Sequence, residues 1–371
     1  MNLALTELRR RPSRFVTATL ILTLLSVLLM LLGGLLDGLT NNSVGAITAQ
    51  RAEIITYSRE AGVILTRSRI DPSTRASIEG VDGVDRIGGL GQTTIGARIN
   101  DAGPRDLVGV ALFGFEIPPV GITEVPADGE AIADDSLREQ GAEIGSVLRL
   151  GPNETPLKVT GFISDSNFQN NASVWVSLDT WRQVTAENRP RAAVGQDVSQ
   201  AITVMGDGTV PVAELIDRID AATNGTTASF TPEGSVLEND AVQGQQGTFN
   251  QIIGVTVTIA VVVVALFFAL LTVERTGLYG VLKAIGARSS TLFIGVVAQA
   301  IVVTLIASAI GSAIAVVLDV TLPPGVIPYQ LGLSRVLFSV VALLFASVVG
   351  CAFSLRRVLR IDPASAIGTA L

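Results

Sequence analysis

The chain has 371 residues, of which 48% are hydrophobic and 16% charged, and its mean hydropathy is +0.52. This composition is too apolar for a soluble protein of that length. The chain holds no histidine and one cysteine. An internal disulfide, a zinc site of the usual Cys/His type and catalysis by an imidazole base are therefore excluded. We expect no metal site and no catalytic residues.

The charges are unevenly distributed along the chain. Residues 39–248 hold 15 basic and 28 acidic residues, a net charge of −13, whereas the rest holds 11 basic and 5 acidic residues, a net charge of +6. An acidic segment is thus inserted between basic flanks. A nucleic acid is not expected as a partner, because no basic surface is available for it in the long segment.

Four apolar stretches are long enough to cross a bilayer core of about 30 Å as helices. They predict transmembrane helices over 15–38, 251–273, 291–318 and 336–355. The alternative for the first stretch is a cleavable signal peptide, but its apolar core is too long and no A-x-A cleavage site follows it directly. We therefore expect an uncleaved helix and an integral protein of the plasma membrane in contact with lipid.

The basic residues of the flanks predict the orientation of these helices. Arginine and lysine concentrate in residues 1–14, in the link 274–290 and in the tail 356–371, while the link 319–335 has a single arginine. Both termini and the 274–290 link are therefore expected in the cytoplasm. The long segment 39–248 and the loop 319–335 are expected outside.

The external segment reads as a mixed α+β domain. Short apolar runs bounded by Gly, Asn and Asp predict strands, and Pro72 and Ser73 predict the start of a helix. One group of strands extends to Ile117, and a second group falls within about 128–182. The fold class expected is a membrane domain of four helices with an inserted extracytoplasmic α+β domain of two lobes. The polar stretch 238–250 is read as a helix continuous with the second transmembrane helix.

This order of segments resembles that of the FtsX-like or MacB-like permeases, the membrane subunits of type VII ABC transporters. The cytoplasmic link VERTGLYGVLKAIGARSSTL and the ending RRVLRIDPASAIG are similar to typical segments of the family. The external strings SIEGVDGVDRIGG and GAEIGSVLRLGPNETPLKVTGFISD resemble its two external lobes. Two further strings, TRSRID and ASVWVSLDTWRQV, look closest to the DevC and HrtB branch.

The resemblance implies a permease subunit that works with a separate ATPase. No G-x-x-x-x-G-K-[ST] phosphate loop is present, and Lys158 and Lys283 are the only two lysines. It implies a complex of two copies of this chain and two ATPases, with ATP and Mg on the ATPases and no cofactor on this chain. The implied function is export of a hydrophobic or amphipathic substrate by mechanical transmission. The alternative is an FtsX-type signalling subunit that regulates external partners without transporting a substrate.

The cytoplasmic link contains a candidate coupling helix, residues 274–290. Its apolar residues recur at i, i+3, i+4 and i+7, which makes one stripe on a helix. A helix of this kind docks into a groove on a partner or lies in the lipid interface, and the family resemblance favours docking to the ATPase. The expected docking residues are Glu274, Arg275, Leu278, Tyr279, Val281, Leu282, Lys283 and Ile285.

The outer half of the first helix is a candidate substrate route. Met30 offers a thioether that can ligate haem iron, and Glu53 or Glu60 offers a carboxylate oxygen. Haem is therefore one candidate substrate, since the HrtB branch exports it. Gly33 and Gly34 are expected to leave space for a bulky planar molecule. The alternative is that Met30 is an ordinary membrane-core side chain and that both glutamates are solvated.

The resemblance also implies a dimer contact between the first and second helices of two copies. The residues expected near it are Leu24, Leu28, Ile259 and Val263.

Overall fold

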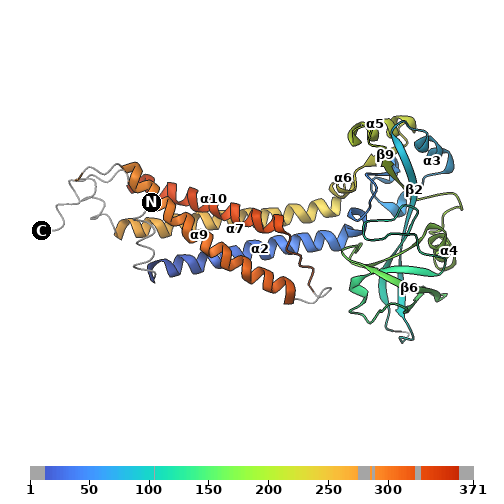
Figure 1. Ribbon diagram of the computed structural model, residues 1–371, viewed down its shortest axis with the longest axis horizontal. Helices are drawn as coiled ribbons and strands as arrows, with labels where there is room; N and C mark the ends of the chain where they lie inside the picture. Colours follow the sequence, from blue (N-terminus) through green and yellow to red (C-terminus); the bar gives the residue numbers. More distant parts are fainter. Residues whose placement is uncertain (1–12, 104, 275–284, 286–288, 322–326, 359–371) are drawn as a thin grey trace. The chain divides into compact units, whose positions relative to one another are not determined.

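The computed structural model describes residues 13–103, 105–274, 285, 289–321 and 327–358 (Figure 1). The chain divides into two compact units. Residues 1–38 and 246–371 belong to the first, here called the membrane unit, and residues 39–245 form the second, here called the external unit.

Long apolar helices make up the described part of the membrane unit. They are α2 (Ser13–Thr48), α7 (Asp240–Glu274), α9 (Ser289–Thr321) and α10 (Leu333–Val358), and all four are long and apolar enough to cross a membrane. The last residues of α2 and the first residues of α7 belong to the external unit. The polar stretch before the second membrane segment is indeed helical, because α7 begins at Asp240.

Small and hydroxyl residues let the membrane helices approach closely. A β-carbon at Gly311 of α9 would lie 2.6 Å from the side chain of Ser26 on α2, and one at Gly350 of α10 would lie 2.7 Å from a backbone oxygen of α7. Thr304 and Ser347 share a buried hydrogen bond between α9 and α10. Such contacts replace the hydrophobic effect, which is weak between helices in lipid.

The external unit is built on one sheet of nine strands in the described residues. They are β1 (Ile54–Ser58), β2 (Val84–Ile99), β3 (Val108–Phe115), β4 (Glu130–Asp134), β5 (Val147–Leu150), β6 (Thr155–Ile163), β7 (Ala172–Ser177), β8 (Ala201–Gly206) and β9 (Thr227–Phe230). Their order is β3-β7-β4-β6-β5-β2-β8-β1-β9, and β2 also pairs with β3. The pairings from β2 through β3, β7, β4, β6 and β5 therefore return to β2 as a closed ring.

The two lobes expected from the sequence are two parts of this one sheet. Six strands form the ring, and β8, β1 and β9 extend from its β2 edge. Strand β2 belongs to both parts, because residues 84–90 pair with β8 and residues 90–97 pair with β3. The ring encloses its own apolar cluster, to which all six strands contribute. A second cluster, around Ile54 and Ile202, packs beneath α3 (Pro72–Glu79) and α5 (Val212–Ala222), which lie side by side in Figure 1.

The side chain of Trp181 occupies the space above two glycines of the sheet. It lies fully buried on α4 (Leu178–Asn188) and donates from Nε1 to Thr93 Oγ1 over 3.1 Å. A β-carbon at Gly91 or Gly114 would come within 2.5 Å or 2.3 Å of its side chain. These positions on β2 and β3 therefore need glycine so that the large Trp181 side chain can pack against the sheet.

The helices of the external unit begin where the sequence supplies capping side chains. Asp71 accepts from Thr74 N at the start of α3, Ser177 from Thr180 N at α4, and Thr231 from Gly234 N at α6 (Pro232–Leu237). An N-cap of this kind satisfies a backbone donor that the helix itself leaves free. The expected helix after Pro72 is confirmed, and it ends at Glu79 with Gly80 as its C-cap.

Candidate functional site

The expected coupling helix lies almost wholly outside the described residues. This applies to Arg275, Leu278, Tyr279, Val281, Leu282 and Lys283. Glu274 is the exposed last residue of α7, and Ile285 is 75% exposed. The docking role of this segment therefore stays a prediction.

The three residues proposed as haem ligands have different surroundings. Met30 is fully buried within the membrane unit. In the external unit, Glu53 accepts a hydrogen bond from Gly206 N over 3.1 Å, and Glu60 lines a cavity described below. A ligand of Met30 needs access to its sulfur, so the bundle would have to part around it.

The expectation that Gly33 and Gly34 leave open space is wrong. A β-carbon at Gly33 would lie 2.3 Å from Arg335 Cδ, and one at Gly34 would lie 2.4 Å from the ring of Tyr329. Gly34 O also accepts a hydrogen bond from Gln330 N over 3.0 Å. The two glycines therefore leave room for the protein's own side chains, in this case those before and at the start of α10.

An ion pair within the membrane unit joins α2 to α10. Arg335 donates from Nε to Asp37 Oδ2 over 2.9 Å and from Nη2 to Asp37 Oδ1. The pair is bidentate, the geometry in which guanidinium and carboxylate interact most strongly. Their side chains are 21% and 33% exposed. We call this pair, with Tyr329 over Gly34, the outer latch.

The external unit holds the last turns of α2 through a loop between β6 and β7, residues 164–171, here called the clasp loop. Ala46 N donates to Asn167 O over 3.1 Å, while Gln169 N and Asn170 N donate to the carbonyls of Ser43 and Asn42 over 3.0 and 2.9 Å. Helix backbone groups are usually occupied within the helix, so three bonds to a loop make a firm junction. Gly45 lies at its centre, where a β-carbon would be 2.7 Å from Asp165 O.

A buried carboxylate fixes the shape of the clasp loop. Asp134, at the end of β4, is 2% exposed. It accepts hydrogen bonds from the backbone N–H and hydroxyl of both Ser136 and Ser166, over 2.6 to 3.0 Å. Four donors compensate the cost of burying this charge. The loop contains Asp165, Gln169 and Asn170 at positive φ, a conformation that side chains adopt only where the surroundings impose it.

The residues expected at a dimer contact lie on the surface of the single chain. Leu24, Leu28 and Ile259 are exposed, and Val263 is partly buried. Exposed apolar side chains on such helices suit either lipid or a second copy, and the contact stays a prediction.

Three of these helices fall largely within a stretch that comparison with known families identifies. Residues 250–363 match the family of FtsX-like permease C-terminal domains. This stretch is an FtsX-like permease domain. The resemblance expected from the sequence is thereby confirmed, as is a multi-pass membrane protein with an inserted α+β domain.

Relatives of the chain extend the similarity beyond that domain. It is 21% identical over 373 residues to the putative hemin transport system permease protein HrtB of Staphylococcus haemolyticus, and the match covers 99% of each chain. It is 35% identical over 144 residues to an uncharacterised ABC transporter permease of Mycobacterium tuberculosis, covering 38% of this chain and 40% of the other. The match to the crystal structure of the periplasmic region of MacB from Actinobacillus actinomycetemcomitans covers 50% of this chain and 92% of that one, at 12% identity and a TM-score of 0.34.

Sequence reasoning missed the outer latch and the clasp loop. The sequence does contain a signal for the latch. Asp37 follows the first apolar stretch, and Arg335 is the one basic residue of the loop after the third apolar stretch. Opposite lone charges at the same side of a membrane are candidates for pairing. The clasp loop has no such signal, because its bonds to α2 run mainly through the backbone.

Proposed function

We propose that the permease is the membrane subunit of an ABC transporter that exports a hydrophobic or amphipathic substrate, driven by a separate ATPase. The observation that carries this proposal is the FtsX-like permease domain over residues 250–363, in a chain that matches an HrtB protein over 99% of its length. Two copies of the permease and two ATPases form the complex, and the ATPases bind ATP and Mg.

The clasp loop supports mechanical transmission as the mode of action. Helix α2 runs unbroken from Ser13 to Thr48, and its last turns are bonded to the clasp loop and buried in the core of the external unit through Val44 and Ile47. Force applied to α2 therefore has a fixed point of attachment in the sheet. Transmission by rigid elements with two arrangements needs such an attachment.

Haem is the substrate that the relatives favour. The relative from Staphylococcus haemolyticus carries hemin transport in its name, and Met30 supplies a soft ligand of the type that haem iron accepts. Because Met30 is buried and the outer latch fills the glycine positions beside it, we propose that the substrate enters only when α2 and α10 separate.

Purification of the tagged permease from its own membranes tests the ATPase partner. We expect a separate chain with a phosphate loop to copurify, and we expect hemin to raise the rate of ATP hydrolysis by the complex. A permease that hydrolyses ATP without any partner would contradict the proposal. A complex whose ATPase rate ignores hemin but activates an external partner would favour the signalling alternative.

A charge on the apolar stripe of the cytoplasmic link tests the docking site. Leu282→Asp places an unpaired carboxylate in the predicted contact, where it costs several kcal/mol. We expect loss of the ATPase from the complex. The matched control is Thr276→Asp, which adds the same charge about 120° away on a helix of 100° per residue. Equal recovery of the ATPase with both variants would place the stripe in the lipid interface instead.

A further inference from the structure

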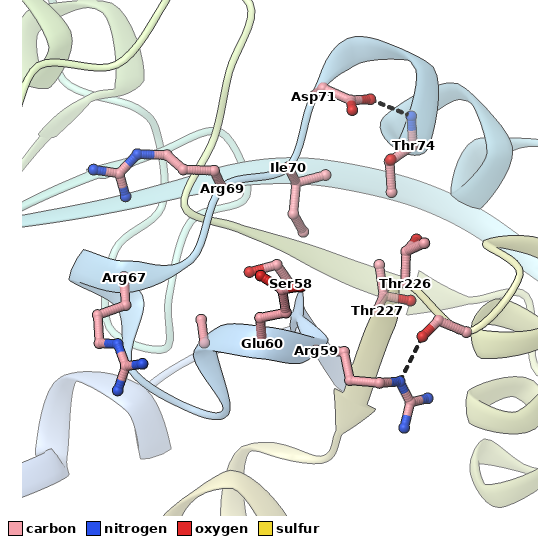
Figure 2. A pocket seen from close by; sticks show the side chains of 12 residues that line it. Ser58, Arg59, Glu60, Arg67, Arg69, Ile70, Asp71, Thr74, Thr226 and Thr227 are labelled. Atoms are coloured by element: carbon pink, nitrogen blue, oxygen red, sulfur yellow. Dashed lines mark hydrogen bonds between the residues drawn. The ribbon is translucent and has the colours of Figure 1, made fainter.

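The external unit contains a cavity of about 710 Å³ (Figure 2). It lies between the chain segment 58–74, which leads from β1 into α3, and the turn 225–227, which leads from α5 into β9. Its volume falls within the range of small-molecule sites. The TRSRID string, residues 66–71, forms part of the wall, and neither the latch nor the clasp loop uses it.

The wall is held in place by backbone and side-chain bonds. Gly62, at φ +59°, reverses the chain between two short helical turns. Ser58 N donates to Ser68 Oγ over 2.8 Å and closes the loop between them. Ile70 exchanges two backbone hydrogen bonds with Ser199, over 2.8 and 3.1 Å. The cavity is therefore a feature of the fold and not of freely moving side chains.

Three arginines on this wall have no ion-pair partner in the described part of the chain: Arg59, Arg67 and Arg69. Arg59 donates from Nε to Gly225 O. Arg69 donates from Nη1 to the carbonyls of Thr66 and Ser68 over 3.0 and 2.7 Å. Burial lowers the pKa of the Arg69 guanidinium, which means that its charge lacks full compensation where it lies.

The two carboxylates of the wall do not neutralise these arginines. Asp71 accepts from Thr74 N over 2.8 Å and from Ser73 Oγ over 2.7 Å at the start of α3, and these bonds lower its pKa. Glu60 forms no ion pair with a described residue. Within a unit whose net charge is −13, the wall carries three positive charges and two negative ones.

We propose that this cavity binds a small molecule that carries carboxylate or phosphate groups. Figure 2 shows Arg67 and Arg69 on one side of the cavity, with Arg59 and Thr226 on the other. A guanidinium presents a planar fork of donors that matches both oxyanions. Glu60, which the sequence offers as an oxygen ligand of haem, also lines this cavity, but the proposed oxyanion ligand is held by the arginines and does not depend on haem transport.

Calorimetric titration of the full-length permease in neutral detergent tests the site. The probes are citrate, inorganic phosphate and dihexanoyl phosphatidylglycerol, kept below its micelle concentration. We expect Arg67→Gln/Arg69→Gln to weaken binding about tenfold or more, since charged hydrogen bonds are lost. The matched control is Arg189→Gln/Arg191→Gln, which removes two exposed, unpaired arginines with the same spacing from the same unit and is expected to bind within about twofold of the unchanged protein.

The probes and variants separate the outcomes. Binding of citrate or phosphate alone supports a free oxyanion ligand, and binding of the lipid alone supports a headgroup. Equal weakening by both double variants, or no binding of any probe to the unchanged protein, would overturn the proposal. Because the Arg69 side chain also bonds to its own loop, Arg67→Gln alone is measured too. The Arg67 side chain makes no hydrogen bond to a described residue, and its backbone N–H, which donates to Ile64 O over 3.0 Å, is kept in the variant.

Discussion

At the scale of single residues, the outer latch is a charged contact between two membrane helices, α2 and α10. Arg335 and Asp37 lie within stretches that are otherwise apolar, and each compensates the other through two hydrogen bonds. A charge in such a position is costly unless it is paired. The pair therefore holds the start of α10 against α2 at the glycine positions that Arg335 and Tyr329 fill.

Charge-neutral variants test the latch. Asp37→Asn and Arg335→Gln each leave one charge without its partner, and we expect each to lower the free energy of unfolding by about 1–3 kcal/mol. The loss is smaller than for a fully buried pair because both side chains are partly exposed. The double variant should recover part of this loss. Thermal unfolding in detergent gives the double-mutant cycle, and strictly additive losses would show that the two residues do not interact.

At the scale of elements, the clasp loop holds the end of α2 in the hydrophobic core of the external unit. Val44 and Ile47 of α2 pack in the same cluster as Phe113 and Trp175 of the sheet. Phe168 of the clasp loop meets Phe113 edge-on, with ring centroids 5.2 Å apart. The helix end is therefore fixed by packing as well as by backbone bonds, and a change at this junction should affect coupling.

Gly45→Ala is the sharpest test of the clasp loop. Replacing glycine by alanine inside a helix normally stabilises it by about 1 kcal/mol, but here the new methyl group would meet Asp165 O at 2.7 Å. We expect lower stability of the external unit and loss of hemin-stimulated ATP hydrolysis. Gly244→Ala is the control, because that helical glycine has open space. A Gly45→Ala variant as stable and as active as the control would remove the clasp loop from the mechanism.

At the scale of the whole molecule, the proposed haem route requires that the substrate reaches the sulfur of Met30. We expect the complex to bind hemin with an absorption spectrum that shifts in Met30→Leu, which removes the sulfur while keeping a similar volume. Leu29→Ala is the control, since it empties a neighbouring buried position without touching the sulfur. If the unchanged complex, Met30→Leu and Leu29→Ala all bind hemin with the same absorption spectrum, Met30 is excluded as a ligand. No bound hemin in the unchanged complex would exclude haem itself.

The fold class was accessible from the sequence because its signals are local. Apolar runs of membrane length and turn residues between short strands need no knowledge of distant contacts. The single continuous sheet was not accessible, because the strand that joins its two parts, β2, contains Gly88, Gly89 and Gly91, and glycines inside a strand weaken its signal. Those glycines are explained only by what packs on them, such as Trp181 on Gly91.

The sequence alone determined that this protein crosses the membrane and that it resembles FtsX-like permeases, and it predicts that ATP is bound by a separate chain. Composition and linear motifs carry those conclusions. Only the tertiary structure decided that the space beside Gly33 and Gly34 is filled by Arg335 and Tyr329. It also decided that three arginines without an ion-pair partner among the described residues line one cavity. Asp37 and Arg335 are nearly 300 positions apart in the chain and meet because their helices pack together. A pattern along the sequence does not show which distant residues come into contact.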